Sequence, residues 1–404
     1  MSGVDLGRRQ LLKLAGCSAL AAAPEQTTAR RFLFTSRGKT GIMNVDGTGL
    51  RFLELDAPNQ VSWQPGPLFR DGRTLILFSA EAGKAWEGNV RTRLWLFDLR
   101  TGSLKEIAEK QRLAPFYSPC LLLPGEERLL VQAVIDREGR LFSMDLDGTR
   151  QQEVTRAGQG FTYGVNLSPD GKRLAFHATG PRPHGYRIFT CNLDGSDRVL
   201  VAGHPDHLYF GVPWSPDGKS VLFQDCLFRE DPGHDWSDLC VGDVGRSGHR
   251  VLTKGQSQWF AAAWGTPENH GSGSNVAQWT PDGRILYTRR LPGARTAFEF
   301  SRTRPDTDHF NRDYKPQEAR GGTELCLLNP ADGSVTQLTR NDPPQWDWGA
   351  LCSPDGRQIL FLRAKTGGYP AIWVMDADGK NQRMLTRGVD GQGAFVSRWL
   401  PDPG

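Results

Sequence analysis

One short phrase recurs along this chain of 404 residues and constrains its fold more than any other feature. Ser-Pro-Asp-Gly stands between two apolar runs in GVPWSPDGKSVLFQDC, residues 211–226. Close copies are VNLSPDGKRLAFHA from Val165, AQWTPDGRILYTRR from Ala277 and ALCSPDGRQILFLR from Ala350. Each copy predicts two strands joined by a tight turn, because Pro presets φ at the first turn position and Gly supplies a positive φ.

A second phrase, built around an Asp-Gly or related turn, alternates with the first. Its glycines, mostly 46 to 55 residues apart with one interval of 88, are Gly47, Gly102, Gly148, Gly195, Gly245, Gly333 and Gly379. Each unit therefore predicts four short strands, and so small a sheet with two apolar faces must stack against neighbours to be buried. The prediction is an all-β fold, a seven-bladed β-propeller of four-stranded antiparallel blades.

The two ends of the chain carry complementary parts of one unit. Residues 31–55 supply three strands, and AFVSRWL from Ala394 supplies a lone first strand. Pairing of the C-terminal strand with the N-terminal blade would close the ring and remove a free sheet edge. We expect a single propeller over residues 31–404, with a large insertion in blade six at about 259–322.

Residues 1–23 are typical of an export signal. Arg8 and Arg9 precede a short apolar stretch that ends at Ala23, as in twin-arginine signals. The stretch is too short to span a bilayer, so we expect an exported protein, periplasmic or extracellular, without a transmembrane span. Two alternatives are left open: an ordinary disordered N-terminus, and a lipoprotein signal in which Cys17 of LAGC carries a lipid anchor.

The charge and the cysteines exclude some classes of site. A formal net charge of +4 without a Lys/Arg-rich run argues against nucleic-acid binding, and we expect a monomer. Cys226 and Cys240 flank one predicted hairpin loop, where an oxidising compartment could bridge them. The absence of a CxxC pair argues against a zinc site made of thiolates. The cysteines in strand-like runs, expected to be small buried hydrophobes, are Cys120, Cys191, Cys326 and Cys352.

The predicted topology separates short connections from long ones. If both turn phrases join their strands on one rim, every other connection emerges on the opposite rim. The irregular connections there are residues 80–92, 177–186, 202–211, 228–238, 255–275 and 289–322. Long loops on a rigid scaffold are where binding and catalytic residues concentrate.

Histidines favour this long-loop rim, and only His249 of the eight falls on the short-turn side. Imidazole and carboxylate groups suit Mn, Zn or Fe, so a divalent metal over the central channel is one hypothesis. Its candidate ligands are His207, His234, His270 and His309, with Asp235 or Asp308. The alternative is a set of independent surface histidines.

Aromatic and arginine side chains provide further candidates. Those that could stack on sugar rings, or else pack between blades, are Tyr209, Trp236, Trp259, Trp264 and Trp348. Those that could clamp carboxylates as bidentate donors, or else form internal salt bridges, are Arg302, Arg304 and Arg312. The turn carboxylates, which we expect to cap their own turns instead of binding calcium, are Asp170, Asp217, Asp282 and Asp355.

The phrases WSPDGKSVLF and MDADGKNQRMLT resemble the repeats of TolB-like (PD40-repeat) β-propellers. This family includes TolB, the propellers of prolyl oligopeptidase relatives and the oligogalacturonate lyases. The resemblance covers nearly the whole chain after the export signal, and it is specific for fold but not for function. It implies a propeller that binds a carbohydrate or a cell-envelope protein on its long-loop rim.

The resemblance also implies an alternative, a metal-dependent lyase that β-eliminates uronic acids. Such an enzyme needs a cation to neutralise the sugar carboxylate and a base to take the C5 proton. The histidine set would hold the metal, and Arg304 or Arg312 would serve the carboxylate or act as the base. The family's metal site combines clustered histidines with a glutamine; Gln256 and Gln258 are present, but a matching cluster is not. We favour the binding function and leave catalysis open.

Overall fold

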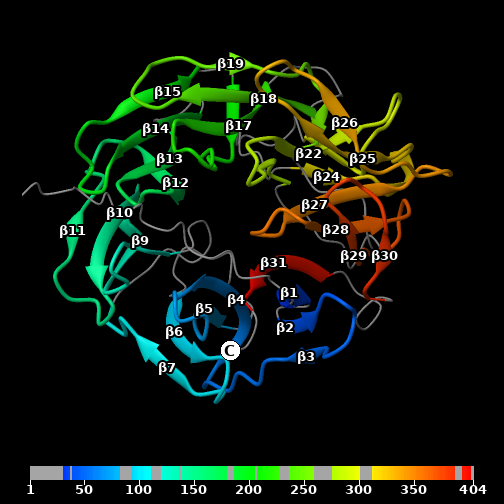
Figure 1. Cartoon of the computed structure of the whole chain (residues 1–404). Helices are drawn as coiled ribbons and strands as arrows, with labels where there is room; N and C mark the ends of the chain where they lie inside the picture. The colour runs from blue at the N-terminus through cyan, green and yellow to red at the C-terminus, as the bar shows by residue number, and fades with distance from the viewer. Residues whose placement is uncertain are drawn as a thin grey trace, which may run out of the picture.

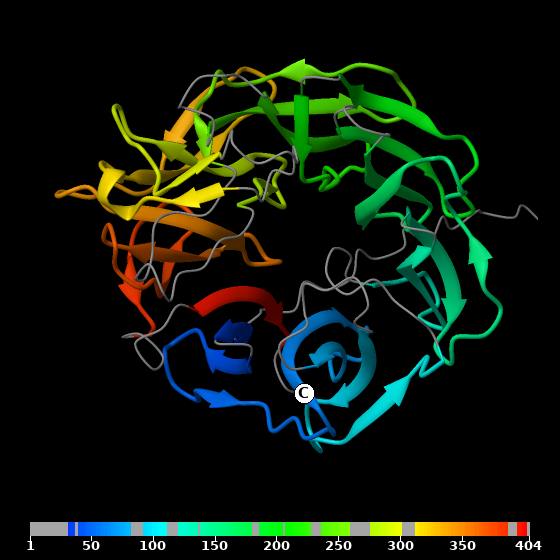
Figure 2. The same cartoon turned by 180° about the vertical axis from the view of Figure 1, so that it is seen from behind.

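A computed structural model places the chain as a ring of small antiparallel sheets around a central axis (Figures 1 and 2). It describes residues 31–36, 39–81, 92–110, 120–135, 138–179, 186–204, 207–227, 236–258, 275–300, 312–386 and 394–401. The described residues are almost entirely strand and turn, with one short 3-10 helix, η1 (Pro316–Glu318). In this part of the chain, no helix has the length and apolar character that a membrane span requires. The predicted all-β propeller arrangement is confirmed.

Five sheets contain four strands each. The strands of each sheet are named in order from the centre of the ring outward, as in Figure 1. Three of them are β31 (Ala394–Leu400), β1 (Arg31–Ser36), β2 (Lys39–Asn44) and β3 (Arg51–Phe52); β4 (Gln60–Leu68), β5 (Thr74–Glu81), β6 (Arg93–Asp98) and β7 (Leu104–Ile107); and β8 (Leu121–Leu122), β9 (Arg128–Ile135), β10 (Glu138–Asp145) and β11 (Gln152–Glu153). The other two are β12 (Phe161–Leu167), β13 (Arg173–Thr179), β14 (Tyr186–Asn192) and β15 (Val199–Gly203); and β27 (Trp346–Cys352), β28 (Gln358–Ala364), β29 (Ala371–Asp376) and β30 (Arg383–Met384).

The prediction of seven separate four-stranded blades is wrong in number, because the fifth and sixth repeats share one nine-stranded sheet. Its strands are β16 (His207–Phe210), β17 (Ser220–Leu227), β18 (Trp236–Asp243), β19 (Arg250–Val251), β20 (Ser257–Gln258), β21 (Gln278–Trp279), β22 (Ile285–Arg290), β25 (Thr323–Leu328) and β26 (Val335–Gln337). The outer strand β19 pairs with β18 only at Cys240 and Val241, so the other end of β18 is open to β20. β20 also pairs with β22 and thereby joins the two repeats. A further hairpin, β23 (Phe298–Phe300) and β24 (Arg312–Tyr314), precedes η1.

The ring is closed by its two terminal strands, as the sequence predicts. β1 pairs antiparallel with β31 from Arg31 opposite Leu400 to Ser36 opposite Ala394. The Arg31 guanidinium also donates a hydrogen bond to the carbonyl of Pro401 at 3.2 Å. One sheet is therefore built from both ends of the chain, and the row of backbone groups on β1 is paired.

Three tryptophans that stand at equivalent positions of the recurring phrase each join their repeat to the one before it. The Trp214 indole donates its N–H to the carbonyl of Asn166, 3.2 Å away in the preceding sheet. The same contact recurs from Trp279 to Pro213 at 3.2 Å and from Trp399 to Leu351 at 3.1 Å. Apolar clusters lie between neighbouring sheets, for example Ile188 and Val201 against Val212 and Phe223. The core of this fold is thus a series of interfaces between sheets.

Prolines and glycines of the turns make a second contact between repeats. At Gly171, where φ is +72°, an added Cβ would stand 2.6 Å from Cγ of Pro124 in the preceding sheet. Gly72 faces Pro401 in the same way, at 2.8 Å. The turn glycine therefore has two functions, since it supplies a positive φ and it leaves room for the proline of its neighbour.

The turn carboxylates are used inside their own turns. The Ser168 hydroxyl donates to Asp170 at 2.7 Å, and the backbone N–H groups of Lys172 and Arg173 donate to Asp170 and to the Ser168 hydroxyl. The same pattern recurs in Ser215–Asp217, Thr280–Asp282 and Ser353–Asp355. These hydrogen bonds hold the pKa of Asp170 below its usual value. The expectation of turn caps is confirmed for these residues.

The strand register corrects the suggested Cys226–Cys240 bridge. Cys240 stands opposite Phe223, and the pairing of β17 with β18 runs without a bulge from Ser220 to Asp225. Side chains alternate between faces along a strand, so Cys226 and Cys240 point to opposite sides of the sheet. The two residues form no disulfide with each other and lie in separate apolar clusters. Cys120, Cys191 and Cys326 are also buried and free, as expected, and Cys352 is half-buried.

His177 is buried in β13 and is 4% exposed. Its Nε2 lies 3.3 Å from the carbonyl of Gly211, and its ring lies over Gly164. Burial lowers the pKa of His177 from the ordinary 6.5 to about 4. The neutral ring is therefore the form that the folded protein accommodates.

The pH dependence of stability should reveal this histidine. As the pH falls below 6.5, the unfolded chain binds a proton that folded His177, with a pKa of about 4, does not bind. The wild type should therefore lose about 3 kcal/mol more of its free energy of unfolding between pH 7 and pH 4 than His177→Gln. Urea unfolding across this range measures the difference. Parallel curves for the two proteins would contradict the assignment.

The Pro–Gly contact can be separated from the cost of a positive φ by two substitutions. Gly171 and Gly102 share a φ of +72°, but nothing lies within 4 Å of a Cβ added at Gly102. Gly102→Ala should therefore cost only about 1–2 kcal/mol of unfolding free energy. Gly171→Ala should cost about 1–3 kcal/mol more, because its methyl group meets Pro124. Urea midpoints at unchanged m-value measure both, and equal losses would rule out the packing role.

Candidate functional site

A cluster of polar side chains lies on the face of β16, β17 and β18 that packs toward β15. Tyr209 stands opposite Asp225, and Phe223 stands opposite Cys240. Directly opposed residues of an antiparallel pair share a face, so these four side chains lie on one side of the sheet. His207 is two residues before Tyr209 and shares that side. The local alternation of the strands thus brings the imidazole, the carboxylate and the thiol to one interface.

Asp225 is the centre of this cluster. Its carboxylate oxygens both lie 2.8 Å from Nδ1 of His207, and the side chains are 9% and 26% exposed, respectively. Burial raises the pKa of Asp225, and the hydrogen bond to His207 opposes that shift. His207 also contacts the rings of Tyr209 and His204, at centroid distances of 5.8 and 4.6 Å. The imidazole is therefore held in one orientation.

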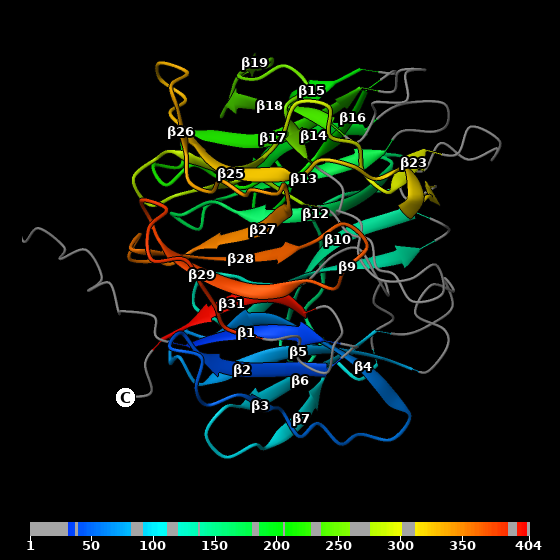
Figure 3. The same ribbon diagram turned by 90° about the vertical axis from the view of Figure 1, so that its right-hand side faces the viewer.

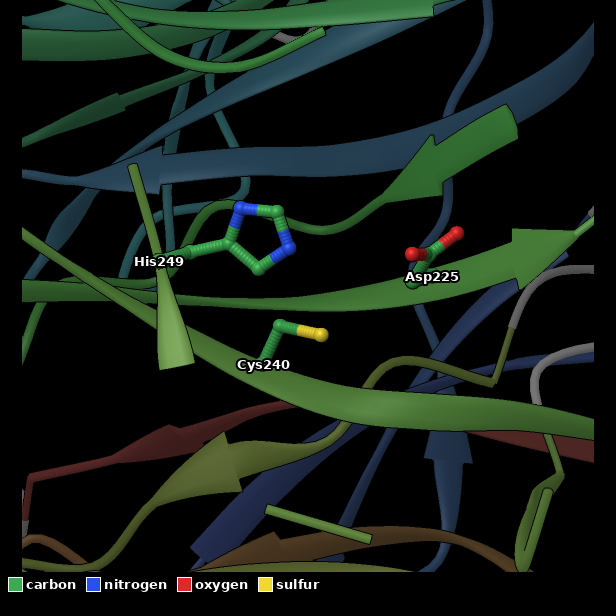
Figure 4. Close-up of side chains that lie close together, drawn as sticks. All are labelled: Asp225, Cys240 and His249. Carbon is green, nitrogen blue, oxygen red and sulfur yellow. The ribbon is translucent and has the colours of Figure 1, made fainter. Parts of the chain in front are cut away.

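His249 approaches Asp225 from the turn between β18 and β19, whereas His207 approaches it from strand β16. His249 ends the turn 244–249, yet its ring lies 5.1 Å from that of Phe223 and 6.2 Å from that of Tyr209. One ligand atom each of Asp225, Cys240 and His249 lies within 4.8 Å of the others, and Figure 4 shows the three side chains directed toward one another. Partial desolvation lowers the pKa of the otherwise exposed His249, and full burial raises the pKa of the Cys240 thiol. In this structure, oxygen, sulfur and nitrogen donors converge on one point.

A buried polar network lies beside this cluster, on the opposite face of β17. The Gln224 amide donates to Ser257 at 2.8 Å and to the Gln258 carbonyl at 3.2 Å. Asn275 donates to the same carbonyl at 2.9 Å and accepts from the N–H of Gly349 at 3.0 Å. The network links β17, β20 and β27, which are far apart in the sequence. Among the described residues, the fully buried side-chain amide of Gln258 has no hydrogen-bond partner.

The described aromatic candidates are packed in the interior. Tyr209, Trp236 and Trp348 are 2%, 8% and 2% exposed and belong to apolar clusters between sheets. This is the packing alternative, and it leaves these rings little surface for a sugar. Arg312 lies in β24 opposite Phe300. The candidates outside the described residues are Trp259, Trp264, Arg302, Arg304, His234, His270 and His309.

Reasoning from sequence did not bring Asp225, Cys240 and His249 together. His249 belongs to a short turn, on the rim opposite to the one predicted for the other histidines. One signal was available, since Asp225 interrupts the apolar run SVLFQDCL of β17. A buried carboxylate needs a partner, so such an interruption marks a polar site.

Known proteins resemble this chain mainly in fold. The Tol-Pal system protein TolB 1 of Novosphingobium aromaticivorans is 29% identical over 85 residues, which are 20% of this chain and 18% of that protein. A puromycin-hydrolyzing peptidase of Mycobacterium tuberculosis superposes with a TM-score of 0.57 at 13% identity, over 90% of this chain and 52% of its own. An oligogalacturonate lyase of Vibrio parahaemolyticus superposes with a TM-score of 0.52 at 14% identity, over 87% and 88%.

No protein-family model matches the chain. The chain spans about a fifth of the TolB relative and about half of the peptidase. The similarity to TolB is local, whereas the superposition on the oligogalacturonate lyase extends over most of both chains. This chain has a β-propeller fold and resembles the TolB-like propellers.

Proposed function

We propose that this protein is an exported binding propeller that holds a cell-envelope protein on its long-connection rim. The observation that carries this proposal is the asymmetry between the two rims. The antiparallel pairing places the short turns on one rim, seen edge-on in Figure 3. These turns, which define the turn rim, are 45–50, 69–73, 99–103, 123–127, 146–151, 168–172, 193–198, 211–219, 244–249, 280–284, 329–334, 353–357 and 377–382.

The turn rim uses most of its polar groups internally. Its carboxylates accept hydrogen bonds from their own turns, as Asp170 and Asp217 do. Its prolines and glycines pack between repeats, as Pro124 and Gly171 do. A surface of short, similar and internally bonded turns offers little that could select one partner.

The opposite rim, here named the long-connection rim, differs from repeat to repeat. The described strand ends at residues 81 and 93, 179 and 186, 227 and 236, and 290 and 323 lie on it. The β23–β24 hairpin belongs to the longest of its connections. The sequence between residues 290 and 323 contains Arg302 and Arg304, and the sequence that follows β20 contains Trp259 and Trp264. Trp and Arg are residue types that dominate binding energy in interfaces.

A protein partner is favoured over a carbohydrate by two observations. The described rings that a sugar would need, Tyr209, Trp236 and Trp348, are buried. The matching relative is, by its name, a protein of the Tol-Pal system. The twin-arginine pattern at Arg8 and Arg9 supports export to the periplasm or the outside, and Cys17 is the alternative lipid-anchored form. We propose that the protein acts as a monomer.

Paired substitutions on the two rims test this proposal. Trp259→Ala and Arg302→Ala should each weaken capture of a detergent-solubilised envelope protein by at least about tenfold, since Trp and Arg are typical hot spots. Lys172→Ala and Lys380→Ala, on the turn rim, are the controls and should change it less than twofold. Quantitative cross-linking measures the captured species. Loss with the turn-rim variants alone would contradict the proposal, and so would binding of an oligosaccharide panel without any protein.

A metal-dependent lyase is the second candidate, and the His207–Asp225 hydrogen bond favours it. The Asp225 carboxylate holds Nδ1 of His207, which would leave Nε2 available to a metal ion. Carboxylates commonly orient metal-binding histidines in this way. His234, His270 and His309 would complete the set, and Arg304 or Arg312 would act on the uronate.

The lyase candidate has a direct assay. Incubation with oligogalacturonate and Mn²⁺ should produce unsaturated sugars that absorb in the ultraviolet, and Arg304→Ala or His309→Ala should abolish this product. An inert wild type with each of Mn²⁺, Zn²⁺ and Fe²⁺ would exclude the lyase.

A further inference from the structure

We propose that Asp225, Cys240 and His249 form a zinc site between the β12–β15 sheet and β17. One donor atom of each residue lies within 4.8 Å of the other two, and the side chains converge (Figure 4). In a tetrahedral zinc site, bonds of about 2.0–2.3 Å set donor atoms about 3.3–3.7 Å apart. Closing the remaining gap requires about an ångström of side-chain adjustment. The backbone does not need to move, because Asp225 and Cys240 are held on neighbouring strands.

The donor types select the class of ion. A carboxylate oxygen, a thiolate sulfur and an imidazole nitrogen are each common zinc ligands. Calcium and magnesium prefer sites made entirely of oxygen, so the sulfur and nitrogen disfavour them. Three protein ligands would leave a fourth tetrahedral position for water or an added ligand, as in catalytic zinc sites.

The charges also balance. The Cys240 thiol would release its proton to the solvent as the zinc–sulfur bond forms. One Zn²⁺ with the Asp225 carboxylate, the Cys240 thiolate and the neutral imidazole of His249 then has no net charge. An uncharged centre is what a buried interface accommodates at the lowest electrostatic cost.

The proposed ligand Asp225 already has a hydrogen-bond partner, His207. His207 is positioned to donate Nδ1–H to the Asp225 carboxylate at 2.8 Å, while Tyr209 stacks on its imidazole. Hydrogen bonds of this kind orient a ligating carboxylate and tune its basicity. His249 is exposed whereas Asp225 and Cys240 are buried, so the ion would enter from the side of the turn 244–249.

The next repeat offers a matched comparison. Cys326 in β25 stands opposite Tyr287 of β22, just as Cys240 in β18 stands opposite Phe223 of β17. The Cys326 thiol is near Glu324, but among the described residues no histidine joins them in a metal-ligand group. Among the residues that the structure describes, the cluster at Asp225 occurs in one repeat, so it is not a consequence of the repeated architecture.

The test is the binding of added zinc by the purified full chain, after its metal has been removed by dialysis against chelator and the chelator has been removed in turn. We expect one zinc per chain by elemental analysis, and Co²⁺ in its place should give a thiolate-to-cobalt charge-transfer absorption. His249→Ala and Cys240→Ser should each weaken zinc binding by more than about 100-fold, whereas Cys326→Ser should retain it. His207→Ala should weaken it by about 10- to 100-fold, as expected for an outer-shell partner.

Two results would overturn the proposal. One is a full chain that binds no zinc, and the other is a His249→Ala variant that binds it with unchanged affinity. Because Cys240 is buried, thermal melts of every apo variant confirm folding, and the exposed His249 provides the decisive substitution. Zinc lost with His270→Ala or His309→Ala but retained in His249→Ala would assign the metal to the lyase candidate instead. Failure of envelope-protein capture would leave this test unaffected.

Discussion

The contact between the Trp214 indole and the Asn166 carbonyl represents the constraint on which the whole ring depends. A four-stranded sheet of this size cannot bury both of its faces, so each repeat is stable only against its neighbours. Burying an indole contributes up to about 4–6 kcal/mol from its area, whereas its hydrogen bond adds only about 1 kcal/mol. The apolar contact therefore supplies most of the stabilisation, and the hydrogen bond fixes how far one sheet is displaced along the next.

The contact between neighbouring repeats explains why the Ser-Pro-Asp-Gly phrase recurs. Its tryptophan reaches back to the preceding repeat, its proline fills the space left by a glycine of the following repeat, and its Ser-Asp pair holds the turn in shape. The turn itself requires Ser or Thr, Pro, Asp and Gly at fixed positions, which is why these residues recur, whereas the tryptophan position is Leu167 or Cys352 in two copies. These contacts also consume the polar groups of the turn rim and leave recognition to the other side.

Much of the fold could be predicted from the sequence, because turns with positive φ and alternating apolar runs are local signals. The pairing of β31 with β1 followed from the complementary ends of the chain. The union of two repeats through β20 could not be foreseen, since Ser257 and Gln258 make a strand only through partners in β18 and β22. The same limit applies to Asp225, Cys240 and His249, whose proximity depends on strand register and on the path of one turn.

The β20 strand has a mechanical consequence. Elsewhere in the described ring, neighbouring sheets meet mainly through side chains. Between β18 and β22, backbone hydrogen bonds to β20 and the buried amides of Gln224 and Asn275 tie the two repeats together. Backbone hydrogen bonds make this the most extensively bonded joint between repeats in the described ring, so we expect any widening of the ring to occur at the other interfaces between sheets. Asp225, Cys240 and His249 all belong to one repeat, on β17, β18 and the turn after β18, so their spacing is set within that repeat and not across an interface between sheets.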